Sequence, residues 1–138
     1  MIFKDSKIDI ETRIKEVLTK VGIEHTSFSI EHPTDSSHGD YATNIALASA
    51  KQSKQNPRTV AETLRAELQD TIACVDHIEI AGPGFINFYL KRSFFADTLR
   101  QIRENSHTWG RNTGEASEEV LFEYTSPNLF KPLHIGNL

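Results

Sequence analysis

Polar residues of the kinds that bind nucleotides and small charged substrates gather near the carboxyl end of this 138-residue sequence. A carboxylate, a hydroxyl, an amide, an ammonium and an imidazole occur there in one short segment, on Glu123, Ser126, Asn128, Lys131 and His134. The segment begins in an apolar run that predicts a buried strand, so a single strand-to-loop segment would present all five groups. A loop with a purely structural role rarely needs this set, although a surface turn is the alternative interpretation.

A glycine between hydrogen-bonding side chains ends the same segment, in the order His134, Gly136 and Asn137. Glycine lets a planar ring or a phosphate approach the backbone closely, and a helix beginning there would direct free N–H groups at the phosphate. The flanking His134 and Asn137 could then stabilise charge that develops on a phosphoryl group. By itself His-x-Gly-Asn is also typical of a surface turn, so the prediction of a phosphate site depends on the whole segment.

A second candidate site lies in the apolar run at residues 85–90, which predicts a strand. Phe85 and Asn87 are two positions apart and therefore face the same side, where an aromatic ring beside an amide suits one unstacked RNA base. Ile86 and Phe88 would then face the core. The alternative is that Phe85 belongs to the core and Asn87 is an ordinary polar residue at a strand end.

Several cations could accompany such a site. Lys51, Lys54 and Arg58 could form a strip that faces phosphates, as could Lys91 and Arg92, and a solvated charged surface is the alternative for each of them. The net charge is −4 and the sequence pI is near 5.8, which excludes binding of nucleic acid through overall positive charge. Any contact with RNA would therefore use a local patch.

The hydrophobic periodicity predicts a helix, a strand, two helices, two strands, a helix and, after a linker, a last strand. Helices are expected at about residues 9–21, 41–50, 57–68 and 93–102, and strands at 25–31, 75–80, 85–90 and 120–124. Asn56 and Ser93 are residue types that cap helices. The turn formers around residues 38–40 predict a loop that closes onto the following helix, in preference to a metal or catalytic pair. This order of elements predicts an α+β fold, in which an antiparallel sheet carries helices on one face.

Composition fits a soluble globular protein, with 38% hydrophobic and 25% charged residues. The amino end lacks the features of a signal peptide, and no apolar run approaches the ~20 residues of a membrane span. The single cysteine, Cys74, is expected to be a buried, inert thiol, and the chain as a whole is expected in the cytoplasm. Turn formers and charge at residues 106–118 predict a linker between a first domain at 1–105 and the start of a second at 119–138.

Three segments together carry a family resemblance. SPNLFKPLHIG at residues 126–136 resembles the signature region of class I arginyl-tRNA synthetases. IEIAGPGFIN at residues 78–87 and HGDYATNIALA at residues 38–48 resemble two segments of the N-terminal additional domain of the same family. The resemblance implies that residues 1–105 form this additional domain and contact the D-loop of tRNA through Phe85 and Asn87. Residues 119–138 would begin a Rossmann-type catalytic domain, which the remainder of the same synthetase chain would complete.

The resemblance also implies roles in binding the amino acid. Glu123 would pair with the guanidinium of L-arginine, a role that suits a carboxylate because the two groups form bidentate hydrogen bonds. Ser126 and Asn128 would hold the backbone end of the amino acid. No metal ligand in the chain itself is implied.

The ATP side of the implied site consists of the last part of the segment. His134 would be the first histidine of the family's HIGH motif, beside ATP and the reacting carboxylate, with Gly136 next to the nucleotide. Lys131 would assist at the phosphates. Asn137 departs from the motif, which has a second histidine there, and an asparagine donates through its amide but cannot carry a proton as imidazolium does.

The implied reaction begins when the arginine carboxylate attacks the α-phosphate of ATP, which is accompanied by Mg²⁺. Arginyl-adenylate forms, and the arginyl group then passes to the 3′ end of tRNA(Arg). For the 138 residues alone we expect no aminoacylation, because the second ATP-binding loop is not among them. One alternative is an RNA-binding module at residues 1–105 that acts without catalysis. Another is a different nucleotidyltransferase with the His-x-Gly signature, which would have no reason to carry GPGFIN.

Overall fold

A computed structural model of the chain describes residues 6–23, 27–111 and Leu121. The chain divides into two compact units, Met1–Asn105 and Ser106–Leu138. All the candidate residues between Glu123 and Asn137, and the strand predicted at 120–124 apart from Leu121, lie outside the described residues. The fold below is therefore that of the first unit.

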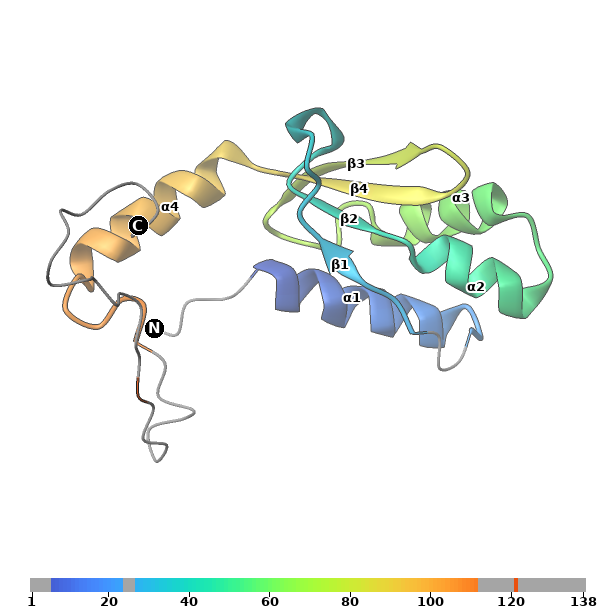
Figure 1. Cartoon of the computed structure of the whole chain (residues 1–138), viewed down its shortest axis with the longest axis horizontal. Helices are drawn as coiled ribbons and strands as arrows, with labels where there is room; N and C mark the ends of the chain where they lie inside the picture. Colours follow the sequence, from blue (N-terminus) through green and yellow to red (C-terminus); the bar gives the residue numbers. More distant parts are fainter. Residues whose placement is uncertain (1–5, 24–26, 112–120, 122–138) are drawn as a thin grey trace, which may run out of the picture. The chain divides into compact units, whose positions relative to one another are not determined.

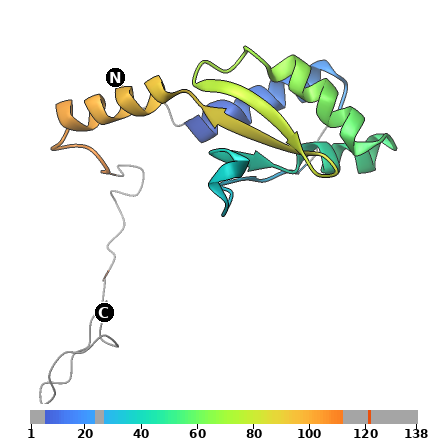
Figure 2. The same ribbon diagram turned by 90° about the horizontal axis from the view of Figure 1, so that it is seen from above.

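The helices and strands of the first unit form an α+β fold, which confirms the predicted class (Figure 1). The elements are α1 (Ser6–Lys20), β1 (Ile30–Glu31), the 3-10 helix η1 (Ser36–His38), β2 (Tyr41–Thr43), α2 (Ile45–Ser53), α3 (Pro57–Leu68), β3 (Val75–Ala81), β4 (Phe85–Leu90) and α4 (Arg92–Glu104). The strands form an antiparallel sheet in the order β1-β2-β4-β3. Helices α1 and α3 lie on one side of this sheet, and α2 packs against α3 (Figure 2).

The core lies between the helices and one face of the sheet. Its apolar residues recur at helical spacing on α1 and α3 and at alternate positions on the strands, as the sequence predicts. The main contributors are Ile10, Ile14, Val17 and Leu18 of α1, Val60, Leu64 and Leu68 of α3, Ile78 of β3, and Ile86 and Phe88 of β4. The predicted start of α3 is also confirmed, because the Asn56 side chain accepts a hydrogen bond from the Arg58 N–H at 2.9 Å.

The helix predicted at residues 41–50 is wrong in its first part. Tyr41–Thr43 form β2 and pair with β4, and α2 begins only at Ile45. The Tyr41 side chain is buried and its hydroxyl lies 3.0 Å from Ser6 Oγ of α1. Pairing with a strand more than forty residues away, together with burial of an aromatic and a threonine, outweighs the helix propensity of the alanines that follow.

The strand predicted at 25–31 is reduced to Ile30 and Glu31, with residues 24–26 outside the described part. The ladder ends at Ile30, and the Ser29 N–H donates to the Asn44 side chain at 3.1 Å. The partner strand β2 is also only three residues long. The edge of the sheet is therefore short.

The loop at residues 38–40 closes onto strand β4 and not onto the following helix. The Asp40 N–H donates to Phe88 O at 2.9 Å, and the Asp40 carboxylate accepts from the Leu90 N–H at 2.7 Å. Gly39 packs so closely on this strand that a Cβ there would lie 2.7 Å from Phe88 O. The prediction named the wrong partner because β4 is distant in sequence.

Two further expectations need correction. Helix α4 begins at Arg92 with Lys91 at its N-cap, so Ser93 does not cap it. Lys91 is already extended, and its carbonyl accepts from the Phe94 N–H at 3.0 Å. Cys74 is half-buried rather than fully buried, because it lies in the turn before β3.

No helix of the described residues is both long and apolar enough to cross a membrane.

Candidate nucleic-acid interface

Strand β4 divides its side chains between the two faces of the sheet. Ile86 and Phe88 have no exposed surface and belong to the core, as predicted. Phe85 points to the opposite face, which we call the outer face, and 41% of its surface is exposed. A phenylalanine that remains this accessible on a sheet is available for contact with a planar partner.

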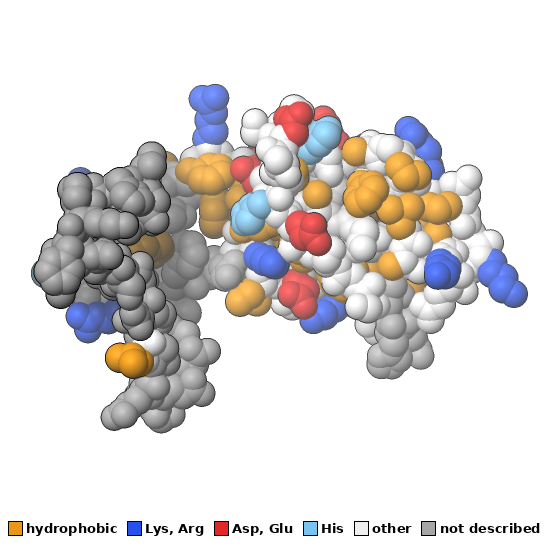
Figure 3. Space-filling model, in the orientation of Figure 1, with side chains coloured by type: hydrophobic (Ala, Val, Ile, Leu, Met, Phe, Trp, Pro, Cys, Tyr) orange, Lys and Arg blue, Asp and Glu red, His pale blue; other side chains and the backbone are white. Residues whose placement is uncertain are grey.

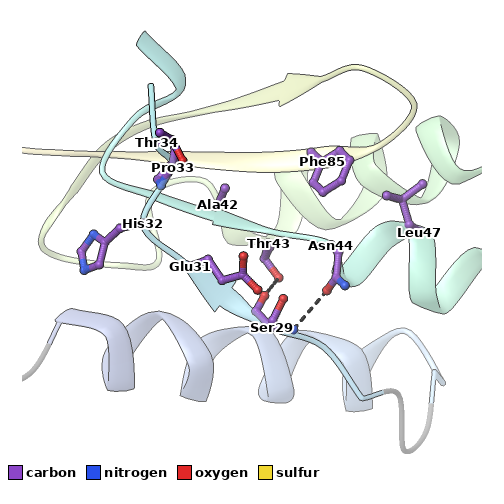
Figure 4. A pocket seen from close by; sticks show the side chains of 10 residues that line it. All are labelled: Ser29, Glu31, His32, Pro33, Thr34, Ala42, Thr43, Asn44, Leu47 and Phe85. Atoms are coloured by element: carbon purple, nitrogen blue, oxygen red, sulfur yellow. Dashed lines mark hydrogen bonds between the residues drawn. The ribbon is translucent and has the colours of Figure 1, made fainter. Parts of the chain in front are cut away.

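A pocket of about 390 Å³ opens beside Phe85 on the outer face (Figure 4). This volume lies within the usual range of small-ligand sites. Residues from β1 and the loop after it, from β2 and from the start of α2 form the walls, among them Glu31, His32, Ala42, Asn44 and Leu47. Figure 4 shows Leu47 beside Phe85 and His32 at the far side.

The polar groups of the pocket differ in how far their hydrogen-bonding capacity is used. The Thr43 hydroxyl donates to Ser29 O at 2.7 Å and accepts from the Ile45 N–H at 3.3 Å. His32 Nδ1 lies 2.8 Å from Asp40 O, so this nitrogen carries the proton and donates. The Glu31 carboxylate makes no ion pair with a cation of the described residues. Its oxygens can therefore accept hydrogen bonds from a ligand at the rim of the pocket.

Asn87 shares the outer face with Phe85, but only 3% of its surface is exposed. Its neighbours across the ladder are Ala42 of β2 and Glu79 of β3, and it does not line the pocket. The spacing of two residues between Phe85 and Asn87 correctly predicted that both side chains lie on the same face. The burial of Asn87 depends on the strands on either side of β4, and the spacing gives no information about them.

A second polar group on the outer face was not found from the sequence. The Tyr89 ring stacks on His77 with centroids 4.2 Å apart and an interplanar angle of 9°. The Tyr89 hydroxyl lies 2.8 Å from Ser37 O and 3.0 Å from Glu79 Oε2. Loss of hydration raises the pKa of Tyr89, and the hydrogen bond to Glu79 and its negative charge raise it further. In the sequence, only the alternation of side chains along β3 and β4 indicates that Tyr89, His77 and Glu79 share a face.

Basic residues flank the pocket on the side of α2 and α3. In Figure 3, a hydrophobic patch at the right-hand end of the first unit has Lys and Arg side chains at its outer margin, and the visible acidic side chains lie away from it. Lys51 and Lys54 are exposed and pair with no carboxylate of the described residues. Arg58 is 3.7 Å from Glu62, and Lys91 donates to Ala73 O at 3.0 Å. Of the candidate cations, Lys51, Lys54 and Arg92 are exposed and make no ion pair with a carboxylate of the described residues.

The described residues contain no group of three or more His, Cys, Asp or Glu side chains that could hold a metal ion. The residues predicted to bind arginine or ATP, or to take part in catalysis, all lie outside the described part of the chain. The outer face of the sheet is thus the candidate site that the structure describes.

Comparison with known proteins agrees with this fold. The family described as the arginyl tRNA synthetase N terminal domain matches residues 9–90. An arginine–tRNA ligase of Citrifermentans bemidjiense is 41% identical over 111 residues, which are 80% of this chain and 20% of that protein. The ligase of Listeria monocytogenes is 35% identical over an alignment of 140 positions, which covers 99% of this chain and 25% of that protein. The chain therefore spans only about a fifth to a quarter of the length of these relatives.

A solved structure has a similar fold. The crystal structure of arginyl-tRNA synthetase from Plasmodium falciparum superimposes with a TM-score of 0.60 at 16% sequence identity, over 70% of this chain and 18% of that one. The family match includes β2, β4 and all the residues that line the pocket. This chain belongs to the family of arginyl-tRNA synthetase N-terminal domains.

Proposed function

We propose that this chain is the tRNA-contacting part of an arginine–tRNA ligase that acts in the cytoplasm on tRNA(Arg). Residues 1–105 would be the tRNA-contacting domain, 106–118 the linker and 119–138 the start of the catalytic domain. The family match and the names of the relatives support the enzyme class. The observation that carries the RNA contact is Phe85, which is 41% exposed beside a pocket on the outer face of the sheet.

In the proposed contact, one unstacked base of the D-loop stacks on Phe85 and enters the pocket. Stacking on an aromatic side chain contributes roughly 1–3 kcal/mol per base. Asn87, which is on the same face of β4 and 3% exposed, would contribute its amide, and the exposed Lys51 and Lys54 would attract the phosphates. A local contact of this kind suits a chain whose net charge is −4.

The chemistry of the full-length enzyme would use the segment that ends the sequence. Glu123 would bind the guanidinium of L-arginine, with Ser126 and Asn128 at its backbone end. His134, Gly136 and Asn137 would line the site of ATP, which binds with Mg²⁺ as a substrate, and Lys131 would approach its phosphates. The arginine carboxylate attacks the α-phosphorus, pyrophosphate leaves, and arginine then passes from the adenylate to the tRNA. The HIGN sequence would serve as the family's HIGH-type signature.

Arginylation kinetics of the full-length protein test the proposal. We expect Phe85→Ala and Phe85→Leu to lower kcat/KM for tRNA by roughly 5- to 150-fold, the equivalent of one stacked base. Phe85→Tyr keeps the ring and is the matched control that should remain near the wild-type value. Asn87→Ala should also lower kcat/KM for tRNA. Equal kinetics for the alanine, leucine and tyrosine variants at position 85 would contradict the stacking role.

Two further measurements separate the enzyme from its alternatives. A full-length protein that binds tRNA but charges none with arginine would favour the RNA-binding module that acts without catalysis. We also expect the 138 residues alone to show no arginine-dependent pyrophosphate exchange, because they span a small part of the relatives' length. Turnover by these residues alone would show that they hold a complete site for arginine and ATP.

A further inference from the structure

Helix α4 presents arginines that take no part in the packing of the first unit. None of the residues of this helix is buried. Figures 1 and 2 both show α4 extending away from the sheet, beyond the end of β4. Its arginines are Arg92, Arg100 and Arg103, and they differ in whether a carboxylate neutralises them.

Two of these arginines form a row along one side of the helix. Arg92 and Arg103 are eleven positions apart, which is about three helical turns, so both side chains leave the helix on the same side. Their positions are separated by roughly 16 Å along the helix axis. Both are exposed, and neither makes an ion pair with a carboxylate of the described residues. We call this pair the arginine row.

The third arginine and the acidic residues of the helix lie on another side. Arg100 is about 80° around the helix from Arg92, and its guanidinium lies 2.9 Å from Asp97 Oδ1. Asp97 and Glu104 are roughly a third of a turn around the helix from the arginine row. No carboxylate of α4 therefore neutralises the row, and its two charges are available to a partner.

A nucleic-acid backbone is the partner whose charge and chemistry suit the row. Guanidinium groups bind phosphates through paired hydrogen bonds. Because the net charge of the chain is −4, contacts with RNA depend on local groups of cations such as this one.

The position of the row allows one tRNA to reach both it and the pocket beside Phe85. Arg92 is seven residues beyond Phe85, at most about 25 Å along the chain. The row adds roughly 16 Å along the axis of α4. For comparison, one turn of B-form nucleic acid is about 34 Å long. We propose that the arginine row is a second tRNA contact, in which Arg92 and Arg103 each bind a backbone phosphate.

This inference rests on the proposed function and adds a site outside the pocket. A phosphate contact fixes the position of the RNA and supplies affinity, but it carries no sequence information of its own. The row is therefore expected to strengthen binding of any tRNA to a similar degree.

The salt dependence of tRNA binding by the full-length protein tests the row. A double variant with Arg92→Gln and Arg103→Gln removes both charges, and a double variant with Arg92→Lys and Arg103→Lys keeps them. Arg100→Gln is the matched control, because it removes the same charge from another side of the same helix. For each protein, Kd for a tRNA(Arg) transcript is measured at several salt concentrations between about 50 and 200 mM, the range over which phosphate contacts weaken strongly.

Each lost phosphate contact lowers the slope of log Kd against log salt concentration by about 0.7–0.9. The slope of the double glutamine variant should thus fall by about 1.4–1.8, which makes its loss of affinity over this salt range roughly 7- to 12-fold smaller than that of the wild type. The double lysine variant and Arg100→Gln should keep the wild-type slope. A tRNA of another specificity should show the same pattern.

Three results would overturn the inference: a wild-type slope for the double glutamine variant, an equal fall in Arg100→Gln, or an equal fall in the double lysine variant. Phe85→Ala distinguishes this failure from that of the proposed function, since it removes the stacking ring and keeps both arginines. If Phe85→Ala leaves charging unchanged while the double glutamine variant loses slope, the pocket contact fails and the row stands. If only Phe85→Ala has an effect, the pocket contact stands and the row is refuted.

Discussion

The close packing of Gly39 on strand β4 leads to a strong prediction for Gly39→Ala. Gly39 has φ 85° and ψ −170°, a backbone conformation that is nearly confined to glycine. A Cβ at this position would lie 2.7 Å from Phe88 O and 3.2 Å from Phe88 C. Neither atom can move freely, because Phe88 O also accepts the Asp40 N–H at 2.9 Å and Phe88 belongs to the central ladder.

The expected cost has two parts. A non-glycine residue in this conformation costs roughly 1–3 kcal/mol. Overlap with packed backbone costs about 1–3 kcal/mol more. The free energy of unfolding should therefore fall by roughly 2–6 kcal/mol, a large share of the ~5–15 kcal/mol typical of a whole domain. The contact also holds the start of β2 against β4, so the same variant should weaken the pocket beside Phe85.

Gly82→Ala is the matched control for this prediction. Gly82 also has a positive φ, 52°, but a Cβ there would meet nothing within 4 Å. Its substitution should cost only the left-handed conformation, about 1–2 kcal/mol. Urea unfolding of the 138-residue chain, followed by circular dichroism, measures both variants. If Gly39→Ala and Gly82→Ala lower the free energy of unfolding by the same amount within error, the contact with Phe88 contributes nothing and the reasoning is refuted.

Two other predictions concern single polar groups. Ser49 is fully buried, and its hydroxyl has no hydrogen-bond partner among the described residues. Ser49→Ala should therefore raise the free energy of unfolding by about 1 kcal/mol. A lower Tm for this variant would show that the hydroxyl does make a hydrogen bond. The pKa of Tyr89 is raised above 10.0 by loss of hydration and then by Glu79, so Glu79→Gln should lower it in a titration of phenolate absorbance, with Tyr89→Phe as the blank. Because the pKa of Tyr89 is raised in the folded state, the contribution of this phenol to stability is present below pH 10 and is lost as the pH rises through the folded pKa. An unchanged titration of Tyr89 in Glu79→Gln would exclude the role of the carboxylate.

The sequence determined those features whose signals are local. The spacing of Ile10, Ile14 and Val17 predicts α1 and its buried face, and Asn56 before Pro57 predicts the start of α3. The alternation along residues 85–90 predicts which side chains of β4 enter the core. Each of these signals spans only a few residues, and the helix or strand period translates it directly into a buried face.

The tertiary structure alone decided the features that depend on distant partners. Tyr41 is in a strand because it pairs with Phe88, and Gly39 is confined by the same residue. Asn87 is covered by neighbours on two other strands, while Asn44, which read as part of a helix, lines the pocket. A residue's accessibility on a sheet is set by the strands beside it, and their register joins segments that no local pattern connects.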